Sequence, residues 1–282
     1  PFNRPMLKAV IFDLDGTLTD SDKVHFQVFQ SLFAERGIAM DKSLYKQKIS
    51  GRQNAAIMAA FFPELSAAEG EQFSAQKEAT FRAQSQLVPL PGLIALLEQI
   101  KRQGLAAAVV TNAPPKNAAF MLAALGLTES FDTIVIADDL PRGKPDPLPY
   151  QTALDQLGIT AAEAIAFEDS VAGIHSAVGA DIVTIGMTTT HTAEELMRVG
   201  ATEAIADFTP RSLTPVLDRY FSAESDCFRR RRQRSEQYFT SSQHFAHFLR
   251  QVNGRPQTWQ GLEGRSDFLR WRAMCGKRER GS

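Results

Sequence analysis

The chain has 282 residues, of which 44% are hydrophobic, and a formal net charge of −1. This length allows one well-buried core with room for a second small domain. No apolar run approaches the ~20 residues that span a bilayer, and residues 1–6 lack the charged-then-apolar pattern of a signal peptide. We therefore expect a soluble, cytoplasmic protein that has no membrane partner.

Charge is distributed unevenly along the chain. Residues 1–221 contain 18 Lys and Arg against 26 Asp and Glu, whereas residues 222–282 contain 13 against 6. Both cysteines, Cys227 and Cys275, lie in the second part, so we expect no disulfide framework. This break in composition predicts a boundary near Phe221.

The first predicted element is a buried parallel strand over residues 9–12, where the sequence is AVIF. Asp13, Asp15 and Gly16 follow directly. Ligands of open α/β sheets bind at the carboxyl ends of the strands, and two carboxylates there suit a hard cation and acid/base chemistry. The alternative is an ordinary polar turn, since Asp, Gly and Thr are common turn residues.

A helical period replaces the strand pattern after Asp20. Apolar residues from Val24 to Phe33 share one face, and helical segments continue to about residue 87 without a strand signal. We expect an all-helical insertion over residues 21–87.

Alternating strands and helices resume at Pro89. This alternation predicts a doubly wound parallel sheet in an α/β core formed by residues 1–20 and 88–221. The predicted strands are 106–110, 133–136, 164–167, 182–185 and 204–206, and the predicted helices are 93–102, 117–125, 149–157, 173–178 and 193–199.

Residues 222–282 differ in character from the rest of the chain. They contain Arg229–Arg232 in a row, and their aromatic residues show little helical or strand period. One interpretation is an arm that binds nucleic acid or another acidic partner. We favour the other interpretation, a basic disordered extension, and do not expect nucleic acid as a partner.

Polar side chains gather at the predicted strand ends. They are Asp13 and Asp15, then Thr111 and Asn112, then Lys144 in the loop RGKPDP, and finally Glu168 and Asp169. Together they supply carboxylates for a cation, a hydroxyl and an amide for oxyanions, and one fixed positive charge. Such a set fits phosphoryl transfer, in which a metal and a lysine neutralise the transferring group.

Four segments, FDLDGT, VVTN, GKPDP and FEDS, resemble the motifs of the haloacid dehalogenase superfamily, over about residues 7–215. The resemblance implies a Rossmann-like core with a helical cap formed by the insertion. It implies that Asp13 is a nucleophile that forms an aspartyl-phosphate and that Asp15 is the general acid/base. Asp15 also argues against the dehalogenase branch, because displacing a halide needs no acid.

The same resemblance implies the remaining roles at the core site. Thr111 and Asn112 would hold the phosphoryl oxygens, and Lys144 would pair with the phosphate and the nucleophile. Mg²⁺ would lie between the nucleophile's carboxylate, the backbone carbonyl of Asp15 and Asp169, with Glu168 in or next to its coordination shell. A non-enzymatic domain would be expected to have lost Asp13, Asp15 or Lys144, and all are present.

The insertion carries the residues expected to select the substrate. His25 resembles the histidine that faces the acid/base aspartate in the sugar-phosphate branch. Arg52 resembles the cap arginine that meets the distal phosphate or hydroxyls of the substrate, and Lys77 resembles a cap lysine that contacts the sugar. Each has a plain alternative as a solvated surface side chain.

Phosphatase and β-phosphoglucomutase activities share this core chemistry. The chain has Thr17 where such mutases carry an apolar residue, and a longer loop over residues 111–117 than theirs. The loop and residues 186–190 resemble sugar-phosphate phosphatases. We therefore favour a monomeric phosphatase that acts on a small phosphate ester, and keep the mutase as the alternative.

Overall fold

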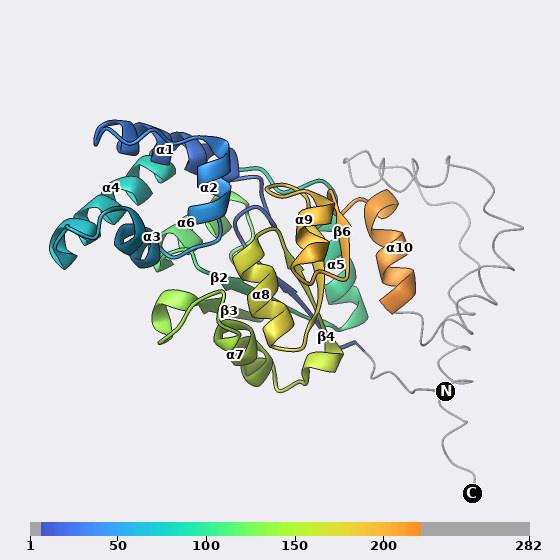
Figure 1. Ribbon diagram of the computed structural model, residues 1–282. Coiled ribbons are helices and arrows are strands. Elements are labelled where there is room, and N and C mark those ends of the chain that lie inside the picture. Colours follow the sequence, from blue (N-terminus) through green and yellow to red (C-terminus); the bar gives the residue numbers. More distant parts are fainter. Residues whose placement is uncertain (1–6, 221–282) are drawn as a thin grey trace, which may run out of the picture. The chain divides into compact units, whose positions relative to one another are not determined.

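A six-stranded parallel sheet forms the centre of the structure, a computed structural model that describes residues 7–220 (Figure 1). The strand order is β3-β2-β1-β4-β5-β6, and every neighbouring pair is parallel. The bounds are β1 Ala9–Phe12, β2 Ala106–Thr111, β3 Thr133–Ile136, β4 Ala164–Glu168, β5 Val183–Met187 and β6 Glu203–Ile205. The predicted doubly wound sheet is confirmed. The strand order reverses at β1, which is where such sheets bind ligands.

Helices connect the strands and cover the sheet. They are α5 Leu93–Gln103, α6 Pro115–Ala124, α7 Leu148–Leu157, α8 Val171–Gly179, α9 Ala193–Arg198 and α10 Pro210–Tyr220, with short 3-10 helices η1 Ala137–Asp139 and η2 Ala161–Glu163. The sequence pattern predicts α5 to α9 with bounds that agree to within about two residues. It does not predict α10, because Pro215 lies inside that helix and proline disfavours a helix interior.

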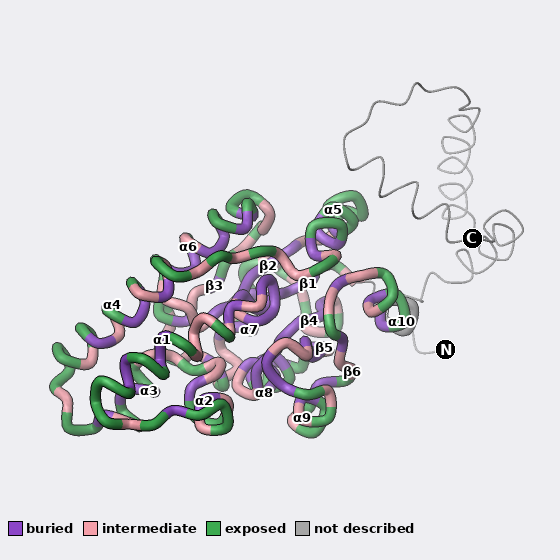
Figure 2. Tube along the Cα trace, turned by 90° about the horizontal axis from the view of Figure 1, so that it is seen from above, coloured by how far each residue is buried: buried purple, intermediate pink, exposed green. Residues whose placement is uncertain are grey.

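Both faces of β1 are buried, which explains its continuous apolar sequence. Val10 and Phe12 join the core on one face, and Ile11 joins the core on the other. The Phe12 ring stacks on Phe167 of β4 at 5.5 Å between centroids and meets Phe208 edge-on at 5.8 Å. Figure 2 shows the buried positions gathered along the central strands, with exposed positions on the outer sides of the helices. Because β1 is packed on both faces, the position of Asp13, which directly follows its last residue, is fixed at the end of the strand.

Between β1 and α5 the chain forms the helical insertion, whose helices are α1 Asp22–Ala34, α2 Lys42–Lys48, α3 Asn54–Phe61 and α4 Ala67–Gln84. They group to one side of the sheet in Figure 1. Phe33, which is fully buried, meets Phe61 and Phe62 edge-on at 5.1 and 5.0 Å and packs beside Phe73. The expected helical insertion is therefore present, and aromatic side chains hold its helices together.

Among the helices of residues 7–220, none is long and apolar enough to cross a membrane. The arginine-rich segment and both cysteines lie outside the described residues. The predicted boundary near Phe221 and the proposed character of residues 222–282 therefore stay predictions.

Candidate active site

The carboxyl ends of β1, β2 and β4 open into a cavity of about 690 Å³, a volume that includes its open mouth. The predicted site residues that line it are Asp13, Asp15, Thr111, Asn112, Lys144 and Asp169 from the sheet side, with His25, Arg52 and Lys77 from the helical insertion. Glu168, the remaining predicted residue, is fully buried beside them. The fold thus brings together residues that are up to 156 positions apart.

Lys144 forms the centre of the buried charge network. Its Nζ donates hydrogen bonds to Asp13 Oδ1 at 2.6 Å, to Glu168 Oε1 at 2.5 Å and to the Val110 carbonyl at 2.8 Å. These three acceptors match the three ammonium protons. The side chain is 2% exposed, so little water reaches it. Burial disfavours the charged ammonium, but the two carboxylates outweigh it and raise the pKa of Lys144. The lysine is therefore a fixed positive charge at every physiological pH.

Asp13 is ionised less easily than an ordinary aspartate. Burial raises its pKa to about 8, and the negative charges of Glu168 and Asp15 add to this effect although Lys144 opposes it. A carboxylate in such a position is stabilised by a further positive charge. The electrostatics of Asp13 therefore favour binding of a cation.

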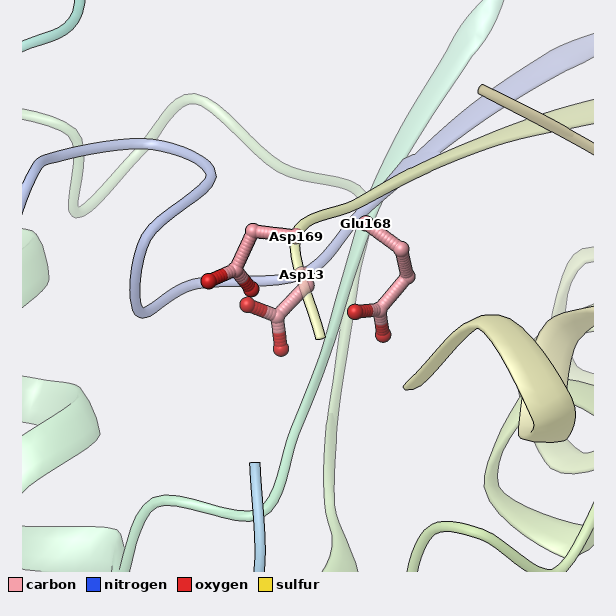
Figure 3. A group of neighbouring side chains, drawn as sticks. All are labelled: Asp13, Glu168 and Asp169. Carbon is pink, nitrogen blue, oxygen red and sulfur yellow. The ribbon is translucent and has the colours of Figure 1, made fainter. Parts of the chain in front are cut away.

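Three carboxylates converge beside Lys144, as Figure 3 shows. Asp13, Glu168 and Asp169 each offer an oxygen, these oxygens lie within 4.8 Å of one another, and all three residues are buried. Glu168 Oε2 is buried and has no hydrogen-bond partner within residues 7–220, although Oε1 accepts from Lys144 and from Tyr150. Hard carboxylate oxygens are the donors that Mg²⁺ prefers. The residues fit a magnesium site.

Gly16 is required for this arrangement. Its φ is +76°, and a Cβ at this position would lie 2.1 Å from Asp169 Oδ2. Only glycine combines that backbone conformation with the close approach. Thr190, for which the sequence predicted no site role although it lies in the segment 186–190, donates from Oγ1 to the same Asp169 oxygen at 2.5 Å. The turn after β1 and the loop after β5 thus orient Asp169 from two sides.

The Asp15 side chain lies outside the three-carboxylate group and faces the helical insertion. Its Oδ1 accepts from Ser21 Oγ at 2.6 Å and lies 2.9 Å from His25 Nε2. Burial opposes ionisation of Asp15, but His25 and Ser21 outweigh it and hold its pKa below the usual value. The His25 ring stacks on Phe81 of α4 at 3.9 Å, with 2° between the planes. Phe81 therefore helps to fix the histidine that contacts the candidate acid/base.

Thr111 and Asn112 have different surroundings. Thr111 Oγ1 accepts from the Ala113 amide at 2.9 Å, which leaves its hydroxyl proton to donate. The Asn112 amide donates to the carbonyls of Gly51 at 2.9 Å and Lys144 at 3.2 Å, and its oxygen accepts from the Lys144 amide. The Asn112 side chain therefore ties the insertion and the Lys144 loop to β2, and phosphate contact by its side chain stays a prediction.

The insertion side of the cavity holds a polar cluster that the sequence analysis missed. Lys77 Nζ lies 2.8 Å from Glu78 Oε1, and both side chains are under 10% exposed. Asn54 and Asn117 also donate to Glu78. Arg52, in contrast, is exposed at the cavity and forms no salt bridge with any residue from 7 to 220. The only sequence signal for Glu78 was its place next to Lys77, and burial of such a pair cannot be deduced from adjacency.

Comparison with known proteins agrees with this geometry. Residues 10–187 match the haloacid dehalogenase-like hydrolase family. The chain belongs to this family. It is 35% identical over 214 residues to validoxylamine A 7′-phosphate phosphatase of Streptomyces hygroscopicus subsp. limoneus, covering 75% of this chain and 96% of that protein.

Two further proteins are similar to this chain. N-acetylmuramic acid 6-phosphate phosphatase of Pseudomonas aeruginosa is 32% identical over 229 residues, covering 79% of this chain and 99% of that protein. The crystal structure of CbbY from Rhodobacter sphaeroides in complex with phosphate superposes with a TM-score of 0.64 at 27% identity, covering 72% of this chain and 95% of that chain. The family predicted from the four motifs is confirmed.

Proposed function

We propose that the chain is a Mg²⁺-dependent phosphatase that hydrolyses small phosphate monoesters, most of all sugar phosphates, through an aspartyl-phosphate on Asp13. The observation that carries the proposal is the buried arrangement at the cavity floor, where Lys144 contacts the Asp13 carboxylate at 2.6 Å and Asp169 and Glu168 lie beside it. The two similar phosphatases, named for validoxylamine A 7′-phosphate and N-acetylmuramic acid 6-phosphate, support the same activity.

The first step transfers the phosphoryl group to Asp13. An Asp13 oxygen attacks phosphorus while the ester P–O bond breaks, and Asp15 gives a proton to the leaving oxygen. Lys144 neutralises negative charge on the transferring group. When bound, Mg²⁺ would be held by Asp13, Asp169 and Glu168 and would supply further neutralisation of the phosphoryl oxygens.

The second step returns Asp13 to its starting state. A water molecule gives a proton to Asp15 and attacks phosphorus, the bond between phosphorus and Asp13 breaks, and inorganic phosphate leaves. Asp15 thus loses a proton in one step and gains one in the next. His25 Nε2, at 2.9 Å from Asp15 Oδ1, is the neighbouring group that can share this proton.

The helical insertion serves as the cap of this site. It contacts the sheet side through the bond from Asn112 to the Gly51 carbonyl and the bond from Gln53 to Asp138 at 3.0 Å. A Cβ at Gly51 would lie 2.4 Å from Ser170 Oγ, so the loop closely approaches the N-terminal end of α8. These contacts support a cap that closes over the substrate and keeps bulk water from the aspartyl-phosphate.

The test uses purified protein with Mg²⁺ and a panel of sugar phosphates, including β-glucose 1-phosphate with a trace of glucose 1,6-bisphosphate. Inorganic phosphate and glucose 6-phosphate are followed in the same tubes. Release of phosphate that EDTA abolishes is the expected result, and gel filtration of the same preparation tests the predicted monomer. Glucose 6-phosphate without free phosphate would establish the mutase instead. If neither product formed, both activities would be refuted for these substrates.

A further inference from the structure

The loop after β5 is short and is held at both ends. At its start, the Thr188 amide donates to the Ile205 carbonyl of β6 at 2.9 Å. At its end, Thr192 and Glu195 form a reciprocal capping box at the N-terminus of α9. Residues 189–191 lie between these two anchors and are therefore kept close to the carboxyl end of the sheet.

Each residue of the segment 189–191 contacts a turn that carries candidate metal ligands. Thr189 Oγ1 donates to the Gly16 carbonyl at 2.5 Å, and Thr190 Oγ1 donates to Asp169 Oδ2 at 2.5 Å. His191 Nδ1 lies 3.0 Å from the Asp169 carbonyl oxygen. Because a carbonyl only accepts, Nδ1 carries the hydrogen of this bond. Thr190 and His191 are 4% and 7% exposed, so water competes little for these hydrogen bonds.

The two carboxylate oxygens of Asp169 have different surroundings. Oδ2 accepts from Thr190 and faces Gly16, where a Cβ would lie 2.1 Å away. Figure 3 shows one Asp169 oxygen directed toward Asp13, which belongs to the same three-carboxylate group. Because Oδ2 is occupied from two sides, Oδ1 is the oxygen that Asp169 offers to a cation.

This difference bears on which cation the site prefers. Mg²⁺ requires a near-ideal octahedron of oxygens at about 2.0–2.1 Å, whereas Ca²⁺ takes about 6–8 oxygens at about 2.3–2.6 Å and binds carboxylates through one or both oxygens. A carboxylate with one oxygen held by a hydroxyl and pressed against a glycine offers only the other oxygen. Such a carboxylate suits Mg²⁺, and it supplies Ca²⁺ with one ligand fewer.

We propose that the segment 189–191 makes the candidate metal site select Mg²⁺ over Ca²⁺, with Thr190 as the positioning residue that limits Asp169 to one available oxygen. This inference rests on the Mg²⁺ dependence proposed above, and it assigns the choice of cation to residues that do not line the cavity. Loss of a hydrogen-bond partner of a metal ligand typically costs about 10–100-fold in metal affinity. Loss of Thr190 should apply this cost to Mg²⁺ and spare Ca²⁺, because the released Oδ2 becomes available to the larger cation.

Calorimetric titration of MgCl₂ or CaCl₂ into the full chain, without substrate at pH 8, provides the test. Thr190→Val keeps the shape of the side chain and removes the donor. Its Kd for Mg²⁺ should rise at least ~10-fold while its Kd for Ca²⁺ stays the same or falls, so the ratio of the Ca²⁺ Kd to the Mg²⁺ Kd should fall at least ~10-fold. Thr190→Ser keeps the hydroxyl and should restore the wild-type ratio. Thr202→Val makes the valine substitution at an exposed position and should leave both affinities unchanged.

The outcomes separate the inference from the proposed function. An equal loss of affinity for both cations, or an unchanged ratio, in a folded Thr190→Val variant would overturn the inference and leave the phosphatase standing. Thr190→Ala removes the same donor, and its ratio decides if circular dichroism shows that the valine variant does not fold. A wild-type chain that binds Mg²⁺ but releases no phosphate from p-nitrophenyl phosphate or the sugar phosphates would refute the proposed function alone, because the two affinities still test the choice of cation.

Discussion

Replacing Lys144 with methionine should destabilise the metal-free protein by about 3–5 kcal/mol at pH 8, the usual cost of removing one partner from a buried ion pair. Methionine fills a similar volume, so the loss reports charge rather than a cavity. The structure supports this magnitude because the lysine is 2% exposed and contacts both Asp13 and Glu168, in addition to the Val110 carbonyl. Hydrogen bonds to charged groups contribute about 1.5–3 kcal/mol each.

The loss should depend on pH with a definite sign. Burial already raises the pKa of Asp13 to about 8, and removal of Lys144 would raise the pKa of the neighbouring carboxyl groups further. The folded variant then keeps its protons while the unfolded chain releases them above about pH 4. Stability therefore falls as pH rises through this window. Wild type and variant share this fall up to about pH 8, where Asp13 of the wild type ionises beside Lys144. Above that pH the stability of the variant continues to fall while that of the wild type levels, so the difference between them should be larger at pH 9 than at pH 7.

Urea unfolding followed by circular dichroism in EDTA measures both quantities. Lys23→Met removes an exposed lysine paired with Asp20 and serves as the control, with an unchanged midpoint expected. Adding Asp13→Asn to the Lys144 variant should recover part of the loss, because a neutral amide tolerates burial without a counter-charge. A loss below about 1 kcal/mol at pH 8, or an equal loss at both pH values, would show that the buried network is not held by charge.

Four further predictions concern catalysis and metal binding. Asp13→Asn should abolish phosphate release, because an amide is a poor nucleophile; a rate above about a tenth of wild type would contradict the assignment. Asp15→Asn should lower kcat by about 10²–10⁴-fold, and rapid-quench kinetics should detect slower hydrolysis of the aspartyl-phosphate; an undiminished kcat would remove Asp15 from the mechanism. Mg²⁺ affinity measured by calorimetry should increase with pH up to about 8 and then level, because binding to ionised Asp13 displaces a proton, whereas a flat profile from pH 6 to 8 would show that Asp13 is not a ligand. Phe81→Leu should loosen His25 and move the Asp15-dependent limb of the kcat/KM profile to higher pH, since His25 lowers that pKa; a limb that does not move would show that the stacking is only structural.

The local sequence pattern was sufficient to predict the sheet and the residues at the floor of the cavity. The buried strand before Asp13 has an apolar sequence because both of its faces are covered, and this feature is visible in four consecutive residues. Parallel strands place their carboxyl ends at one edge, so residues that follow β1, β2 and β4 had to converge. That rule alone predicts that Asp13, Thr111 and Asp169 lie together.

Tertiary packing decided the other wall of the cavity. Glu78 is 24 residues from Asn54 and 39 from Asn117, and its burial depends on how α4 lies against α3 and α6. Apart from its place next to Lys77, nothing in the sequence distinguishes it from exposed Glu71 on the same helix. The side-chain role of Asn112 likewise followed from the approach of the Gly51 loop. Sequence specifies chemistry through neighbouring residues, whereas burial and partner choice depend on distances between segments, and these arise only when the whole chain packs.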